Sequence, residues 1–145
     1  MVITFSVVLA LMLILIRPLQ RNPFFLIYFG LVIGAAYYME TYMFKLSPFS
    51  PKLIWGFVLL HIIIINLVTI IAYGTDKKAA IKGQWRVPEM QLHTLELLGG
   101  WVGAFIAQKI FHHKTKKKSY QSLFWLTLII QLTAVYYIAK FLHIF

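Results

Sequence analysis

The chain has no cysteine and only four acidic residues among its 145. Without cysteine, disulfides and thiolate chemistry are excluded, and nothing in the sequence indicates a redox compartment. Charged residues make up 12% of the chain and hydrophobic residues 61%, with a mean hydropathy of +0.79. This composition leaves too little polar surface to cover a water-soluble globule. With no internal repeat or linker in view, it predicts a single membrane domain over residues 1–145.

The formal net charge is +10, and the basic residues form short clusters at the ends of apolar runs. This distribution favours anionic lipid head groups as the counter-charge and argues against nucleic acid. Met1 is followed directly by apolar residues, without a basic segment or a small-residue cleavage site. The first apolar run is therefore expected to stay in the protein rather than to be removed as a signal peptide.

Five apolar runs predict an all-α bundle of membrane helices, at about residues 2–16, 23–44, 52–74, 88–111 and 120–142. A helix needs about 20 residues to cross a bilayer, and the first run is short by that measure. The longest polar stretch, residues 74–91, separates the third run from the fourth. Pro88 and Glu89 predict a helix start at its end, because both residue types suit a first turn.

Two topologies are open for the fourth run. If it crosses the membrane, the lysines and arginines divide seven against seven between the two sides, and the positive-inside rule gives no orientation. If it dips in and returns at Gly99 and Gly100, they divide eleven against three. A stripe of residues that stays in helical phase through the glycines favours crossing.

That stripe is the most informative pattern in the sequence. It places six residues on one helix face, at spacings of four and three: Glu89, His93, Glu96, Gly100, Gly103 and Ala107. Gly99 and Gly103 also form a G-x-x-x-G motif, which is typical of close helix packing. One end of the face is therefore ionisable, and the other is small enough for another helix to approach.

Glu96 lies about 10 Å deeper along the helix axis than Glu89, among leucines. Such a carboxyl is either held neutral or paired, with His93 or with Asn66 or Thr69 of the third run. Glu89, His93 and Glu96 also form a weak candidate metal site, since imidazole plus two carboxylates is a known ligand set. No other His or Asp supports it, so no cofactor is implied.

The third run carries a second stripe at intervals of three and four: Asn66, Thr69, Tyr73 and Lys77. Asn66 and Thr69 are expected to make hydrogen bonds between helices. The charged residues around the polar stretch, Asp76, Lys77, Arg86 and Glu89, are expected to pair with each other at the interface. Two polar faces therefore flank one loop.

Several ordered motifs resemble a known family. They are the stretches 66–69 (NLVT), 73–80 (YGTDKKAA), 86–89 (RVPE), 92–93 (LH), 99–104 (GGWVGA) and 111–115 (FHHKT). Over about residues 61–125 the chain resembles the bacterial domain-of-unknown-function 1294 family, whose members usually carry arginine where His112 stands. The resemblance implies a small multi-pass protein of the bacterial cell membrane, and it brings no activity with it.

The leading hypothesis is a site that binds an anionic phosphate head group, of a lipid or a lipid-linked carrier, at the basic loop. Its cations are Lys77, Arg86, His113 and Lys114, with Asp76 and Glu89 orienting them. One alternative is a non-catalytic helper or homo-oligomer that uses the glycine face to bind another chain. The other is a membrane enzyme with His93 as acid or base beside Glu89 or Glu96. Whether the protein is an enzyme is left undecided.

Overall fold

The computed structural model describes residues 23–43 and 51–141, so the first predicted helix, at residues 2–16, lies outside it. Every regular element in these two ranges is helical, which confirms the predicted all-α class. In chain order they are α3 (Pro23–Met43), α4 (Pro51–Lys82), α5 (Glu89–Leu95), η1 (Glu96–Gly100), α6 (Trp101–Phe111) and α7 (Lys118–Phe141).

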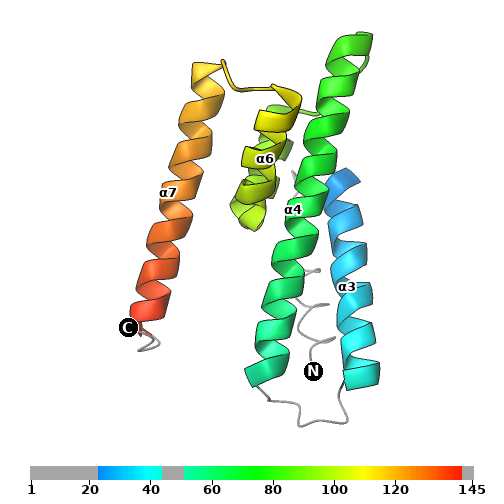
Figure 1. The fold of residues 1–145 in the computed structure, drawn as a ribbon, viewed down its shortest axis with the longest axis vertical. Coiled ribbons are helices and arrows are strands. Elements are labelled where there is room, and N and C mark those ends of the chain that lie inside the picture. The colour runs from blue at the N-terminus through cyan, green and yellow to red at the C-terminus, as the bar shows by residue number, and fades with distance from the viewer. Residues whose placement is uncertain (1–22, 44–50, 142–145) are drawn as a thin grey trace.

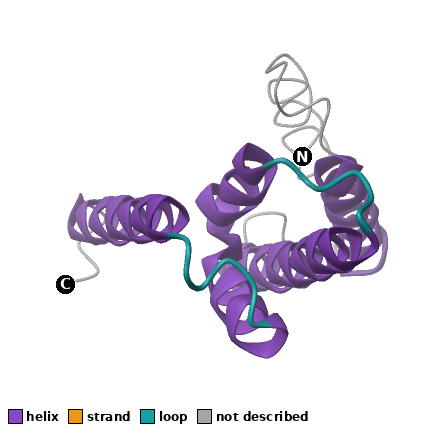
Figure 2. Ribbon diagram, turned by 90° about the horizontal axis from the view of Figure 1, so that it is seen from above, coloured by secondary structure: helices purple, strands orange, loops and turns teal. Residues whose placement is uncertain are grey.

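The long helix α4 is the centre of the bundle. It packs against α3 on one side and against α5, η1 and α6 on the other, while α7 contacts α5 and η1 (Figure 1). Seen from above, α7 stands to one side of the other helices (Figure 2). The core is made mainly of aromatic residues of α3 and small and branched residues of α4, α5 and α6, among them Phe25, Tyr28, Ile65, Val68, Leu92, Leu95 and Ala104.

Helix α4 continues eight residues beyond the predicted end at residue 74. Gly74 does not stop it, because this glycine serves packing: a Cβ there would lie 3.2 Å from the ring of Phe111. The helix ends at Gly83, whose φ of +63° is in the left-handed region that favours glycine. The charged residues Asp76 and Lys77 therefore lie on the helix and not in a loop.

The fourth predicted helix, residues 88–111, is not continuous. Gly99 has a φ of +107°, which interrupts it in the wide turn η1. The chain then turns back, because Lys114, just after α6, donates to Glu89 at the start of α5. We call residues 89–111 the re-entrant hairpin. The prediction of one continuous helix with a single six-residue stripe was therefore wrong, because residue spacing does not show a break in the backbone.

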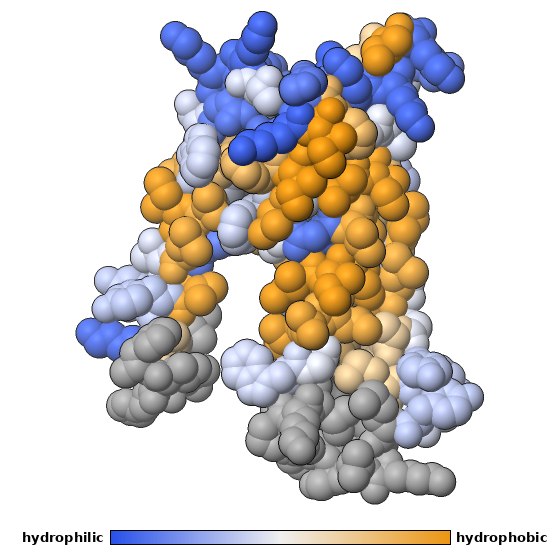
Figure 3. Space-filling view, viewed as in Figure 1, coloured by the Kyte–Doolittle hydropathy of each residue, from blue (hydrophilic) through white to orange (hydrophobic). Residues whose placement is uncertain are grey.

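Helices α4 and α7 contain the two segments in the described chain that are long and apolar enough to cross a membrane, Trp55–Lys82 and Lys118–Phe141, and α3 contains a shorter apolar one. Figure 3 shows apolar side chains around the middle of these helices and most of the strongly hydrophilic ones at the top. Nine of the eleven lysines and arginines in residues 51–141 lie at that end, where α4 and α6 finish and α5 and α7 begin. Together these features indicate membrane association.

Candidate functional site

Asn66 holds the tip of the re-entrant hairpin against the middle of α4. Its Oδ1 accepts a hydrogen bond from the backbone N–H of Gly103 at 2.6 Å, and its Nδ2 donates to the carbonyl of Gly99 at 3.2 Å. Beside it, His61 Nε2 donates to the carbonyl of Leu98 at 3.2 Å. These contacts fix the position of the hairpin along α4, since each joins the tip of the hairpin to a particular turn of that helix.

The glycines of the hairpin let it approach α4 closely. A Cβ on Gly103 would collide with the backbone carbonyl of Asn66, and a Cβ on Gly100 would collide with the hydroxyl of Thr69. Both glycines are buried. The glycine face that the sequence offered to another chain therefore packs on α4 of the same chain.

At the centre of the hairpin lies what we call the inner centre, formed by Glu96, Tyr73, Tyr120 and His93. The Glu96 carboxylate is fully buried and its Oε1 accepts hydrogen bonds from the hydroxyls of Tyr73 and, at 2.9 Å, Tyr120. Its Oε2 lies 2.7 Å from Nδ1 of His93. The carboxylate thus has three donors from three helices, none of which needs to carry a charge.

Three glutamines extend the hydrogen bonds of the inner centre. Gln108 donates to the Tyr73 hydroxyl at 3.3 Å and accepts from Gln121 at 2.6 Å. Gln131, halfway along α7, donates to the carbonyls of Glu96 and Leu97, both at 2.7 Å. Because carbonyls next to a helix break lose helical partners, Gln131 satisfies groups that the turn at Gly99 frees. Polar contacts therefore attach α7 to the hairpin.

His93 is held on two sides. Its ring stacks on that of Tyr120, with centroids 4.2 Å apart and an angle of 29°, and its Nδ1 faces Glu96. With Glu96 as acceptor, Nδ1 carries a hydrogen and Nε2 presents a lone pair. Nε2 is buried and has no hydrogen-bond partner within residues 23–43 and 51–141. Leaving such an atom unpaired costs about 1–3 kcal/mol.

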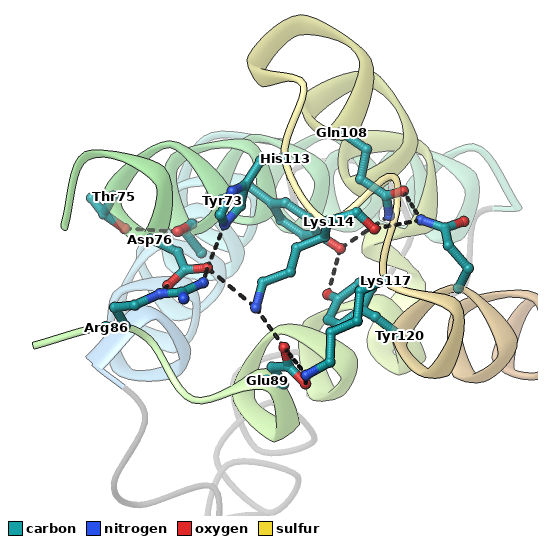
Figure 4. A network of polar contacts seen from close by, with 12 residues as sticks. Tyr73, Thr75, Asp76, Arg86, Glu89, Gln108, His113, Lys114, Lys117 and Tyr120 are labelled. Carbon is teal, nitrogen blue, oxygen red and sulfur yellow. Dashed lines mark hydrogen bonds and ion pairs between the residues drawn. The ribbon is translucent and has the colours of Figure 1, made fainter. Parts of the chain in front are cut away.

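The outer centre, as we name it, lies one turn of α4 closer to the basic end and consists of Asp76, Arg86, His113, Lys114, Glu89 and Lys117 (Figure 4). Arg86 donates to both carboxylate oxygens of the buried Asp76, from Nε and Nη2, at 3.3 Å each. This contact raises the pKa of Arg86 above its ordinary value. His113 Nε2 lies 2.7 Å from Oδ2 of Asp76, and Lys114 Nζ 3.7 Å from it.

Lys114 joins the two carboxylates of the outer centre. Its ammonium donates to Glu89 at 2.6 Å, and Lys117 donates to both oxygens of Glu89 at 2.9 and 2.8 Å. The hydrogen bonds from Lys114 and Lys117 lower the pKa of Glu89 to about 2. The Lys114 side chain is only 7% exposed, whereas that of Lys117 is 54% exposed. Lys114 is thus a cation inside the structure, and Lys117 faces outward.

The loop between α6 and α7 has an unusual backbone. His112 and Lys114 have φ values of +45° and +64°, in the region that residues with a Cβ adopt rarely. This path directs His113 and Lys114 onto Asp76. Left-handed residues other than glycine are costly and tend to occur at functional sites. The strain is therefore located at the segment that assembles the outer centre.

A cleft of about 640 Å³ opens beside the outer centre. Its lining combines four cations with one carboxylate: Arg86, Glu89, His112, Lys114, Thr115, Lys116 and Lys117. Three of these cations, Arg86, Lys116 and Lys117, are exposed. The cleft is therefore positively charged and suited to an anion.

The structure separates the three residues that were weak metal candidates. His93 and Glu96 bond to each other, whereas Glu89 lies in the outer centre on two lysines. In the part of the chain that the structure describes, no group of three His, Cys, Asp or Glu residues is placed to hold a metal ion.

The other candidate residues lie as follows. Arg86, His113 and Lys114 converge on Asp76, and Glu96 lies on His93 as one of the expected pairings. Glu96 does not use Asn66 or Thr69, which bond elsewhere. Lys77 is on α4 next to Asp76, but no contact of Lys77 with the outer centre is seen among the described residues.

Several residues of the site were not anticipated. Tyr73 carried a signal, since it continues the stripe of Asn66 and Thr69 by one turn. Tyr120 and Gln108 gave none, because a tyrosine beside a basic cluster is typical of any membrane interface and a lone amide of any helix. His61 carried no signal in the sequence either. It links Leu98 to the Tyr28 hydroxyl, which lies 2.6 Å from its Nδ1.

Comparison with known proteins identifies this region. The family described as "Protein of unknown function (DUF1294)" matches residues 66–120, a stretch that contains every residue of the inner and outer centres. The uncharacterized protein YsdA of Bacillus subtilis is 33% identical over 79 residues, which are 53% of this chain and 89% of YsdA. No solved structure matches. The chain belongs to the DUF1294 family.

Proposed function

We propose that this chain is a multi-pass protein of the bacterial cell membrane whose basic end binds the anionic phosphate head group of a membrane lipid or lipid-linked carrier. The observation that carries the proposal is the cleft beside the outer centre, where four cations face one carboxylate at the end of apolar helices. Phosphate oxygens accept charge-assisted hydrogen bonds from such cations. A lipid would place its phosphate there while its chains lie along the helices.

Arg86 is suited to the phosphate because Asp76 uses only one edge of its guanidinium. Two of its five N–H donors point at Asp76, and its side chain is 48% exposed. The remaining donors can make a two-point contact with a phosphate. Asp76 then acts as the group that orients Arg86.

The charge distribution supports an orientation. With α3, α4 and α7 crossing and the hairpin re-entering, nine of the eleven basic residues of residues 51–141 lie on one side, which the positive-inside rule assigns to the cytoplasm.

The helper and the enzyme hypotheses each depend on residues whose contacts are seen in the structure. A helper that binds a partner through the glycine face lacks that face, since α4 covers Gly100 and Gly103. An enzyme that uses His93 retains Glu96 as the orienting carboxylate, but Glu89 is engaged by lysines. The head-group site needs no rearrangement of these pairs.

The test is lipid retention in native mass spectrometry of the detergent-purified protein, with phosphatidic acid against phosphatidylcholine. We expect selective retention of the anionic lipid, weakened about fivefold by Lys116→Gln, because one lysine near a phosphate contributes about 1 kcal/mol. Lys109→Gln is the matched control: it removes the same charge at the same end, from a lysine that lies over the ring of Phe105. Equal weakening by both variants, or no selectivity, would contradict the proposal.

A further inference from the structure

The feature of the inner centre that packing does not explain is the imidazole of His93. Any flat ring could stack on Tyr120, and any donor could serve the Oε2 oxygen of Glu96. An imidazole adds Nε2, which is buried without a partner in the described chain. Its orientation is fixed by two contacts, so Nε2 points in one direction as a hydrogen-bond acceptor.

His93 is close in the chain and in space to residues that line the cleft. It is one helical turn after Glu89, which lines the cleft. Lys114, another lining residue, has its ammonium 5.4 Å from the centre of the Tyr120 ring on which His93 stacks. Glu89 and Tyr120 therefore connect the imidazole to the lining of the cleft. The His93 side chain keeps 11% of its surface exposed, and its Nε2 is buried.

We propose that Nε2 of His93 accepts a hydrogen bond from a hydroxyl of the bound head group, so that the site selects phosphate esters carrying a hydroxyl, such as the glycerol head group of phosphatidylglycerol. An acceptor needs a donor, and the donors found on lipid head groups are hydroxyl and ammonium groups. The net positive cleft disfavours ammonium. This inference rests on the proposed function and adds the identity of the head group.

The test compares retention of phosphatidylglycerol and phosphatidic acid by the wild-type protein and by His93→Asn. The amide nitrogen of asparagine replaces Nδ1 and keeps the bond to Glu96, but asparagine has no atom where Nε2 lies. The wild type is expected to prefer phosphatidylglycerol about fivefold, the value of one hydrogen bond. His93→Asn is expected to lose this preference. Charge alone predicts the opposite order, because phosphatidic acid carries the more negative phosphate.

The outcomes separate the two proposals. Retention of both anionic lipids without preference, or a preference that survives in His93→Asn with an unchanged melting temperature, would overturn the role of His93 and leave the head-group site standing. Retention of neither lipid would remove the head-group site itself. Soluble glycerol phosphate at the same phosphate concentration is expected to compete weakly. Complete displacement by it would overturn the assignment to a membrane lipid.

Discussion

Asp76 and Glu96 are both fully buried, but they have different surroundings. Asp76 is contacted by an arginine, a histidine and a lysine, and Glu96 by two tyrosines and a histidine. The two sites are close: Tyr73, which donates to Glu96, precedes Asp76 by one turn of α4. The change from cationic to hydroxyl donors occurs within that turn.

This difference follows from depth along apolar helices. A lysine or arginine near a helix end can keep its charged group near water, whereas deeper along the helix that cost rises steeply. A tyrosine hydroxyl supplies a donor without bringing a charge. The outer centre therefore has surplus positive charge and opens to a cleft, while the Glu96 carboxylate of the inner centre is fully buried and bonded to groups without a permanent charge.

The largest expected effect comes from separating the hairpin from α4, because both centres are formed between these two elements. Gly103→Leu would place a side chain against the backbone of Asn66, and we expect a loss of more than about 4 kcal/mol, enough to prevent folding. Gly30→Leu is the control, because a Cβ at Gly30 meets nothing within 4 Å. Thermal unfolding and monodispersity in detergent measure both. An equally stable Gly103→Leu protein would contradict the close packing of hairpin and α4.

The next effect tests the outer centre alone. Asp76→Asn leaves Arg86, His113 and Lys114 without the carboxylate they share, and we expect a loss of about 3 kcal/mol, the usual cost of leaving buried charges unpaired. Equilibrium unfolding in mixed micelles gives the value. A cost below that of Glu96→Gln would reverse the comparison between the centres.

Glu96→Gln tests the inner centre and should cost less, about 1–2 kcal/mol. The glutamine oxygen can still accept from the tyrosines, and its amide can donate to His93 once the imidazole shifts its hydrogen to Nε2. The same unfolding measurement applies, with Tyr120→Phe as a variant that removes one donor and keeps the ring. A loss as large as that of Asp76→Asn would show that the inner centre depends on a negative charge.

The sequence predicted the helical class because apolar runs of this length allow little else. It also predicted that Asp76, Lys77, Arg86 and Glu89 would pair with each other. Arg86 does bond to Asp76, whereas Glu89 bonds to Lys114 and Lys117. A return at Gly99 and Gly100 was the less favoured of two topologies, because Gly99 looks the same in a helix and in a break. Only its φ of +107° distinguishes the two.

The inner centre was harder to predict than the outer one for a physical reason. Residues of opposite charge are recognisable as possible partners in a sequence, so ion pairs can be proposed from charge and proximity alone. The partners of hydroxyl and amide donors cannot be recognised from charge. Tyr120 and Gln108 contact Tyr73 although they lie 47 and 35 residues from it in the sequence. Their positions depend on the hairpin turning back, which the spacing of residues did not show.

The smallest expected effect concerns pH and the exposed part of the outer centre. The pKa of Glu89 falls from 4.5 to about 2, so its bonds with Lys114 and Lys117 stabilise the fold fully above pH 4.5 and are lost as the pH falls toward 2. Because Glu89 is 36% exposed, solvent screens the contribution to below about 1 kcal/mol. The measurement is the melting temperature of wild type and Glu89→Gln against pH.

The difference in melting temperature between the wild type and Glu89→Gln reports on Glu89 alone, because both proteins contain Asp76. It should stay constant from neutral pH to pH 4.5, shrink between pH 4.5 and 2, and decrease with added salt. The sign follows from the direction of the shift, since a carboxyl with a lowered pKa stabilises the fold only while it is ionised. A difference that grows on acidification would mean that Glu89 is protonated in the fold and that the lysines do not hold it. The outer centre would then lack the ion pairs that set it apart from the inner one.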